Sequence, residues 1–494
     1  MRSGWWLLLL LVASVACAAQ TKYSEPYRPQ YHFSPPQTFM NDANGMVYFR
    51  GEYHLFYQHN PQGNLWGHMS WGHAVSPDMV HWQNLPVAIP EAQEYMIFSG
   101  SAAVDWKNSS GLCDRDPCLV AIYTAHSEGW QRQNIAYSLD RGRAWKEYSG
   151  NPVIDLHKPD FRDPKVFWFE PQKKWVLVTV FADERQAVFF ESKDLKSWKQ
   201  MSTFGPGGTT QGQWECPDLM QLPIAGTRAK KWVLIISRNP GAPQGGTGVQ
   251  YFVGNFDGTK FTSETSDSQK MWIDYGKDFY ATQRFADLPA SDKRIIWMGW
   301  VGDWLYANKE PTSPWRGVQS IPRELFLRKC QEGYCVDQRP IRELESLREK
   351  AIPLKFNGRQ KELDIALPSA SFELEAEIAS ARECQLFIHD SANHTIVVGF
   401  DPEKRQVYVD RTESAQANFS PDFPGRHAGA IASGNRVRLH IFVDQTTLEL
   451  FANDGERVIT DRVYLNGAAR VGLQSASSDA TATLTLWPMK SIWR

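Results

Sequence analysis

Short apolar segments recur along the first two thirds of the chain at a nearly constant interval. They occupy residues 53–57, 119–123, 175–178, 232–236 and 295–298, and successive segments begin 56 to 66 residues apart. Four of them are followed by a second feature, a turn that contains Asp and then an aromatic residue, at Asp78, Asp140, Asp194 and Asp257. Asp in such a turn suits a tight connection between strands. Strand-rich units that repeat at this length are typical of radially arranged blades, so the pattern predicts a five-bladed β-propeller.

The rest of the pattern also indicates an all-β chain. Long helical patterns are absent from residues 30–330, and the paired repeat disfavours the alternative, a generic β-sandwich with coincidental spacing. Beyond the repeats, residues 372–378, 436–441 and 483–486 alternate strictly between apolar and polar, as half-buried antiparallel strands do. We therefore predict a propeller over residues 20–340, a linker or short amphipathic helix over residues 341–358, and a structural or accessory β-sandwich over residues 359–494.

The N-terminus has the features of a secretory signal. Arg2 precedes an apolar run over residues 5–12 that is too short to span a bilayer, and small residues follow at positions 16–19. We predict a signal peptide over residues 1–19 and a secreted protein, extracellular or periplasmic. Cys17 raises the alternative of a bacterial lipoprotein, but Ser14 stands where such signals usually carry Leu. No other stretch approaches the ~20 apolar residues of a spanning helix, so no membrane partner is expected.

Composition narrows the classes of partner. The net charge is −2, from 53 basic and 55 acidic residues, so there is no basic excess for nucleic acid, whereas an uncharged substrate such as a sugar fits. The 20 Trp, 17 Tyr and 26 Phe suit large cores and also surfaces on which sugar rings stack. For any single aromatic side chain, a position in the core is the more frequent of the two. The spacing of Cys113 with Cys118 and of Cys330 with Cys335 predicts two local disulfides, leaving Cys216 and Cys384 over. The oligomeric state stays open.

Three carboxylates stand at equivalent places in the repeat. Asp42 lies in residues 39–45 (FMNDANG), Asp163 in residues 161–164 (FRDP) and Glu215 in residues 214–218 (WECPD), each shortly before its apolar segment. A single motif of this kind is more often a turn or a salt bridge, but three in register predict one axial pocket. Two carboxylates are what glycosidic cleavage requires, one as acid and one as nucleophile or stabiliser. Arg162 beside Asp163 suits hydrogen bonds to sugar hydroxyls.

These motifs resemble the three signatures of glycoside hydrolase family 32, the invertases, inulinases and levanases. The likeness extends through residues 27–33, 53–58, 98–101, 278–281 and 311–316 and covers essentially the whole mature chain. Within the family the chain is most similar to secreted bacterial levanases and exo-inulinases. The resemblance implies a retaining β-fructofuranosidase that releases fructose from fructans and sucrose through a covalent fructosyl-enzyme, on a propeller followed by a sandwich.

The resemblance also implies a role for each site residue. Asp42 would attack C2 of the fructosyl unit, Asp163 would stabilise the transition state, and Glu215 would act as acid and then base. A further set would contact the fructose or shape the pocket: Phe39, Met40, Asn41, Gln58, Trp66, Phe98, Ser99, Arg162, Tyr280 and Trp300. No metal and no organic cofactor is implied.

Two residues beside the nucleophile depart from the family pattern. Phe39 stands where the family usually has Trp, and Ala43 where it usually has Pro. Losing Pro removes a fixed φ and frees a backbone N–H, whereas Phe keeps an aromatic wall but loses the indole donor. We expect the catalytic chemistry to survive, because Asp42 and its neighbours Asn41, Asn44 and Gly45 remain. The effect on substrate preference and rate stays open.

Other functions stay open from the sequence. The chain has no H-E-x-x-H metal motif, no dinucleotide fingerprint or P-loop, and no G-x-S-x-G elbow. The alternatives are a sugar-binding protein on a non-catalytic propeller, a propeller hydrolase of arabinan or xylan, and a fructosyltransferase. The preference among levan, inulin and sucrose is also open, as is exo against endo attack, although a deep axial pocket favours exo.

Overall fold

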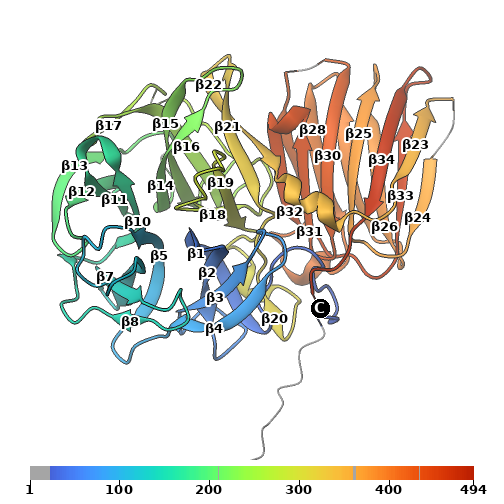
Figure 1. The fold of residues 1–494 in the computed structure, drawn as a ribbon. Coiled ribbons are helices and arrows are strands. Elements are labelled where there is room, and N and C mark those ends of the chain that lie inside the picture. Colours follow the sequence, from blue (N-terminus) through green and yellow to red (C-terminus); the bar gives the residue numbers. More distant parts are fainter. Residues whose placement is uncertain (1–22, 210, 267, 360–362, 433, 494) are drawn as a thin grey trace, which may run out of the picture.

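The computed structural model describes residues 23–209, 211–266, 268–359, 363–432 and 434–493. The predicted signal peptide, residues 1–19, lies outside the described residues. The chain is all-β, and its N-terminal propeller is followed by a C-terminal sandwich, drawn in blue to yellow and in orange to red in Figure 1. Within the described residues, no helix is long and apolar enough to cross a membrane.

Between residues 38 and 340 the described strands form five sheets. The first contains β1 (Thr38–Phe49), β2 (Glu52–Asn60), β3 (Ser70–Ser76) and β4 (Gln83–Ile89), with β20 (Trp315–Arg316) parallel to β1. The second contains β5 (Met96–Asp105), β6 (Cys118–Ser127), β7 (Trp130–Ser138) and β8 (Lys146–Glu147), and β9 (Ile154–Lys158) pairs with β7.

The other three sheets follow the same antiparallel order. The third contains β10 (Phe161–Phe169), β11 (Lys174–Phe181), β12 (Gln186–Ser192) and β13 (Trp198–Phe204). The fourth contains β14 (Gln213–Pro223), β15 (Lys230–Asn239), β16 (Gly248–Phe256) and β17 (Phe261–Ser263). The fifth contains β18 (Tyr280–Arg284), β19 (Ile296–Trp300), β21 (Arg323–Cys330) and β22 (Gly333–Pro340), and short 3₁₀ helices η1 (Glu170–Gln172) and η2 (Ala307–Lys309) lie in connections.

The sequence repeats correspond to fixed positions in these sheets. The five apolar segments fall on the second strands β2, β6, β11, β15 and β19, whose residues are mostly buried. The four Asp turns end the third strands β3, β7, β12 and β16, where Asp78, Asp140, Asp194 and Asp257 each accept two backbone N–H bonds. These side chains complete the turns in place of backbone acceptors. The predicted strands and turns are therefore confirmed.

The sandwich consists of two six-stranded antiparallel sheets. One has the order β23 (Ile352–Asn357), β34 (Thr481–Pro488), β25 (Phe372–Ala379), β30 (Arg436–Asp444), β31 (Thr447–Ala452) and β32 (Arg457–Arg462). The other has the order β24 (Leu363–Leu367), β33 (Ala469–Ser475), β26 (Cys384–Asp390), β27 (Thr395–Asp401), β28 (Gln406–Glu413) and β29 (Arg426–Ala430). The alternating apolar residues of both sheets form one core between them. Two 3₁₀ helices, η4 (Ala417–Phe419) and η5 (Asn453–Gly455), lie in loops.

The segment between the two parts, expected to be a linker or short amphipathic helix over residues 341–358, contains a short helix and a strand. It begins with the 3₁₀ helix η3 (Arg342–Leu347), which buries Leu344 and Leu347, and continues into β23, which pairs with β34. The sandwich sheet thus includes residues 352–357. Alternation over only six residues, with a half-exposed apolar face, gives too weak a signal to separate this edge strand from a connection.

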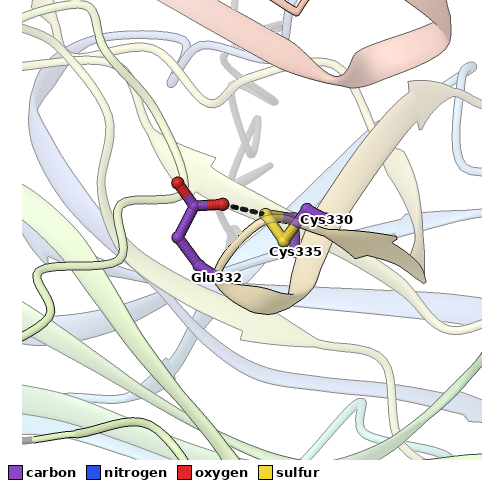
Figure 2. Close-up of side chains that lie close together, drawn as sticks. All are labelled: Cys330, Glu332 and Cys335. Carbon is purple, nitrogen blue, oxygen red and sulfur yellow. Dashed lines mark hydrogen bonds between the residues drawn. A yellow bond between two sulfur atoms is a disulfide. The ribbon is translucent and has the colours of Figure 1, made fainter.

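Both predicted disulfides are present. Cys113 bonds to Cys118, and Cys330 bonds to Cys335 across the turn of the β21–β22 hairpin, where Figure 2 shows Glu332 beside the sulfur of Cys335. Cys216 and Cys384 are free and buried. Each bridge closes a loop of only a few residues, so its effect is local.

Buried charges connect the sandwich to the propeller. His32 lies between two sandwich carboxylates, with Nδ1 3.1 Å from Asp444 Oδ2 and Nε2 3.0 Å from Glu449 Oε1. The guanidinium of Arg323, in β21, also donates to Glu449. All four side chains are fully buried. Removing one partner of such a network leaves an uncompensated charge, so the network fixes the two parts in one arrangement.

Candidate active site

Each of the five first strands carries a β-bulge at an equivalent position. In β1, Asn41 and Asp42 together oppose Gln58, and in β10, Asp163 and Pro164 oppose Thr179. The same two-against-one mismatch occurs at residues 98–99 of β5, 216–217 of β14 and 281–282 of β18. A bulge bends its strand and re-aims a side chain that regular alternation would place elsewhere. The repeated bulges thus turn residues of five strands towards a shared region. The motifs that contain Asp42, Asp163 and Glu215 coincide with three of these bulges.

The backbone at three of these bulges lies in the left-handed region. Asp163 has φ 63°, Cys216 has φ 44° and Ala281 has φ 49°. Non-glycine residues with such angles are uncommon and persist where the surrounding structure holds them, often at functional sites. The bulged residues are also buried, with Asp42 9% and Asp163 6% exposed.

Asp42 is held by three donors. Ser99 Oγ donates to Oδ2 at 2.7 Å, Asn41 Nδ2 donates to Oδ1 at 2.9 Å, and the thiol of Cys216 lies 3.6 Å from Oδ2. Burial raises the pKa of Asp42 to about 6, the Ser99 hydrogen bond opposes this increase, and the charge of Glu215 adds to it. Hydrogen-bond donors therefore fix the orientation of the Asp42 carboxylate, as a nucleophile requires.

Asp163 shares the thiol of Cys216 with Asp42. The Cys216 backbone N–H donates to Asp163 Oδ2 at 2.9 Å, and the Cys216 sulfur lies 3.6 Å from the same oxygen. Burial raises the pKa of Asp163 to about 7, the charge of Arg162 lowers it, and the charge of Glu215 raises it. Because one sulfur touches both carboxylates, Asp42 and Asp163 face the same small volume.

Glu215 is the most accessible of the three carboxylates, and its two oxygens have different partners. Arg162 donates to Oε1 from Nε at 3.1 Å and from Nη2 at 3.0 Å, while the Tyr280 hydroxyl donates to Oε2. Glu215 is 18% exposed at its side chain, compared with 7% for Arg162. The group therefore combines a fixed orientation with access to solvent, which an acid and base catalyst needs.

The structure places the other predicted residues at different depths. Phe39, Tyr280 and Trp300 share one hydrophobic cluster with Cys216, and Phe98 packs against it. Trp66 is 40% exposed, with its ring edge-on to Phe98 at 6.0 Å. Gln58 is buried, opposite the β1 bulge, and donates to the Ile97 carbonyl.

The structure places one predicted residue, Met40, in a core and adds two residues, Trp304 and Gln213, that the sequence did not indicate. Met40 is fully buried in a separate core cluster that includes Phe33 and Tyr57, and its contact with substrate stays a prediction. Trp304 packs with Trp300 at 4.8 Å and with Phe39 at 6.4 Å, and Gln213 accepts from Arg162 Nη2 at 2.8 Å. Gln213 lies two residues before Glu215 in the same strand, so the two-residue period of a strand places both side chains on one face and could have indicated Gln213. Trp304 lies in a loop, where no such periodicity exists.

Two groups among the described residues come close enough to bind a metal ion. Cys330 and Cys335 with Glu332 form the first, but both sulfurs are joined in the disulfide. In the second group, Glu373 and Glu375 with His440, both oxygens of Glu373 accept from Arg348 at 2.7 Å. A guanidinium in that place competes with a cation. Neither group lies among the residues around Asp42.

The two-part fold and the buried carboxylates are those expected of a glycoside hydrolase, and comparison with known proteins gives the family. Residues 32–340 match the family model "Glycosyl hydrolases family 32 N-terminal domain", and residues 343–488 match the model "Glycosyl hydrolases family 32 C terminal". The chain belongs to glycoside hydrolase family 32.

Relatives and solved structures agree with this assignment. The chain is 45% identical to a levanase of Bacillus subtilis over 99% of its own length and 74% of the relative's. It is 38% identical to an extracellular exo-inulinase of Aspergillus niger, over 92% of this chain and 94% of the relative. Its structure is similar to that of exo-inulinase from Aspergillus awamori, with a TM-score of 0.88, 35% identity and coverage of 95% and 100%. The expected likeness to levanases and exo-inulinases is confirmed.

Proposed function

We propose that the protein is a secreted, exo-acting, retaining β-fructofuranosidase that releases terminal fructose from fructans and sucrose. The observation that carries the proposal is the convergence of Asp42, Asp163 and Glu215 around Cys216, Arg162 and Tyr280. The relatives support the substrate class, because they are named levanase, exo-inulinase and, at 36% identity in Schizosaccharomyces pombe, invertase. A similar structure, the β-fructofuranosidase of Schwanniomyces occidentalis at 30% identity and TM-score 0.89, is complexed with fructosyl-erythritol.

In the proposed first step, an oxygen of Asp42 attacks C2 of the terminal fructosyl unit. Glu215 gives its proton to the glycosidic oxygen as the C2–O bond breaks, so the leaving sugar departs with a neutral hydroxyl. Asp163 accepts hydrogen bonds from fructose hydroxyls and stabilises the cationic character that develops at the ring. Arg162 and Tyr280 then hold the Glu215 carboxylate that this step leaves behind.

In the proposed second step, Glu215 removes a proton from a water molecule, which attacks C2 from the side that the leaving group vacated. The bond between C2 and Asp42 breaks, and Asp42 regains its negative charge. Two inversions give retention. The donors from Ser99 and Asn41 stabilise Asp42 as a leaving group in this step, as they orient it for attack in the first.

The same proposal extends to architecture. Each of the five sheets between residues 38 and 340 is one blade, which makes the propeller, residues 20–340, five-bladed. The bulge shared by all five first strands supports this count. Residues 341–358 connect it to the sandwich of residues 359–494, although β23 already pairs within the sandwich sheet. Removal of residues 1–19 releases a secreted protein, in line with the extracellular relatives.

Product analysis tests the proposed function. Chromatography of products from sucrose, inulin and levan over time is expected to show fructose from the first samples. Early oligosaccharides would refute exo attack, arabinose from arabinan would support the other hydrolase class, and fructosyl oligomers at high sucrose concentration would indicate transfer. Glu215→Gln is expected to abolish turnover and to keep sugar binding, with Glu91→Gln as a matched control on the partly exposed surface. Unchanged turnover in Glu215→Gln would refute the assigned acid.

A further inference from the structure

A cavity of about 450 Å³ lies at the far ends of the strands that carry the catalytic residues. It is lined by Val104 and Asp105 at the end of β5 and by Val166 and Trp168 towards the end of β10. On β5, Ser99 precedes Val104 by five residues, and on β10, Asp163 precedes Trp168 by five. A strand advances ~3.3 Å per residue, so the cavity lies roughly 16 Å from the catalytic carboxylates along these strands. Figure 1 shows β5 and β10 neighbouring each other in the propeller.

Buried charges lie on the strands between the catalytic residues and this cavity. Lys165 Nζ lies 3.3 Å from Asp218 Oδ2, and Arg284 Nε donates to Asp218 Oδ1 at 3.2 Å. Lys165 also donates to the Arg284 carbonyl at 3.0 Å, which connects β10, β14 and the end of β18. None of Asp42, Asp163 and Glu215 lines the cavity, so it is a different site from the one around Asp42.

The cavity is lined with indole rings whose orientation is fixed by hydrogen bonds. The Nε1 atom of Trp106 donates to Asp287 Oδ1 at 2.9 Å, and that of Trp175 donates to Ser109 Oγ at 2.9 Å. Trp168 donates to Glu170. Trp106 is nevertheless 53% exposed, although a partly buried carboxylate, Asp287, anchors its indole. Trp175 is 4% exposed, and Lys107 Nζ lies over the Trp168 ring at 5.2 Å, so Trp106 is the indole with the most open face. Because its hydrogen bond fixes this ring before binding, a ligand can pack on it with little ordering cost.

The polar groups of the cavity suit a neutral ligand with many hydroxyls. Asp105, Glu170 and Asp287 are balanced in part by Lys107 and Arg284, so neither sign dominates. Among the described residues, Nη1 and Nη2 of Arg284 have no hydrogen-bond partner, while Nε is held by Asp218. A guanidinium edge beside carboxylates offers donors and acceptors together, and indole faces pack on the apolar faces of sugar rings. A volume of this size is within the range of small-ligand pockets.

We propose that this cavity, formed by Trp106, Trp168, Trp175, Glu170, Arg284 and Asp287, is a second saccharide-binding site that takes one or two sugar units of a fructan chain. That the sugar is fructan rests on the proposed function of the catalytic site; that it is a neutral saccharide rests on the cavity alone. A polymer bound here stays near the enzyme between successive cleavages, which raises the local concentration of chain ends. A soluble disaccharide gains nothing from this second site.

Trp106→Ala tests the proposal in two measurements. The loss of one aromatic contact is expected to lower kcat/KM on levan or inulin by about threefold to tenfold and to leave kcat/KM on sucrose unchanged. In the inactive Asp42→Asn background, calorimetric titration with the trisaccharide 1-kestose is expected to show two equivalents per chain, and one when Trp106→Ala is added. Trp106→Phe, which keeps an aromatic face, is expected to retain the second equivalent.

Leu139→Ala is the matched control, because Leu139 is 50% exposed and lies in the turn after β7, outside this cavity. Equal loss of polymer activity in the control, or a single equivalent of 1-kestose in the parent, would overturn the second site. Fructose release from sucrose tests the proposed function separately. If sucrose is cleaved but the second equivalent is missing, only the second site fails; if sucrose is not cleaved, the titration still counts the sites.

Discussion

Ser99→Ala is expected to shift the pH dependence of catalysis through one hydrogen bond. The Ser99 hydroxyl donates to Asp42 Oδ2 at 2.7 Å inside a buried pocket, and only the ionised carboxylate benefits from it fully. Burial holds the pKa of Asp42 at about 6, and the Ser99 bond already restrains that increase. Removing the donor therefore raises the pKa of Asp42 further, and a larger fraction of the nucleophile is protonated at any acidic pH.

The size of the shift follows from the strength of the bond. A hydrogen bond to a charged group contributes about 1.5–3 kcal/mol, and 1.36 kcal/mol corresponds to one pH unit. Asn41 and Cys216 still contact the carboxylate, so the lower end applies and the acid limb is expected to move from about pH 6 to about pH 7. Below both midpoints, kcat/KM on sucrose is then about tenfold lower than in the parent, and the difference disappears above pH 8.

The assay is initial-rate kcat/KM on sucrose from pH 4 to pH 9, with stability checked at each end. Ser101→Ala is the matched control, because Ser101 lies on the same strand and is equally buried but bonds to Pro164 and Val166. It is expected to lower stability and to leave the acid midpoint unchanged. The reasoning is wrong if Ser99→Ala lowers the rate equally at all pH values, since the hydroxyl would then act on substrate and not on the titration of Asp42.

Three further variants test how buried charge affects stability. Asp42→Asn is expected to raise the free energy of unfolding at pH 7 by up to about 3 kcal/mol, because the folded pKa of Asp42, about 6, exceeds its unfolded value. Ionisation of Asp42 therefore opposes folding above pH 4, and urea unfolding at pH 4 and pH 7 should show the gain in stability only at pH 7. Burial lowers the pKa of His32, but the two carboxylates beside it outweigh burial, so the net effect is a raised pKa. His32→Ala should therefore cost more stability at pH 5 than at pH 9, where the imidazole is neutral. Asp218→Asn is expected to cost about 3–5 kcal/mol by leaving Lys165 buried without its anion, and Lys165→Met in the same chain should restore most of it in chemical denaturation.

The sequence was informative about the fold where the pattern is local. The apolar second strands and the Asp turns behind them depend on neighbouring residues alone, so they could be predicted from four repeats of the same turn. The strand β23 was less accessible because its half-exposed residues resemble a connection. An edge strand is defined by its partner, β34, which lies more than a hundred residues further along the chain.

The candidate site was predictable in its carboxylates and less so in their partners. Asp42, Asp163 and Glu215 stand at equivalent positions of a repeat, which is visible along the chain. The bulges are not, since a register mismatch exists only once two strands pair. The contact of Cys216 with both aspartates depends on such a bulge. Trp304 depends on a loop from the fifth sheet reaching Phe39 of the first, which no local pattern encodes.

The protons of this pocket belong to a cluster of carboxyl groups. The charge of Glu215 raises the pKa of Asp42 and of Asp163, and the charge of Asp42 also raises that of Asp163. Interacting groups titrate in macroscopic steps that cannot be assigned to one residue from a rate profile alone. Of the three carboxyl groups, Ser99 donates to Asp42, whereas Arg162 contacts Glu215 and adjoins Asp163. If the acid limb moves with Ser99→Ala while the alkaline limb stays, the acid limb reports mainly the nucleophile; if both limbs move together, the three carboxyls share their protons throughout the working pH range.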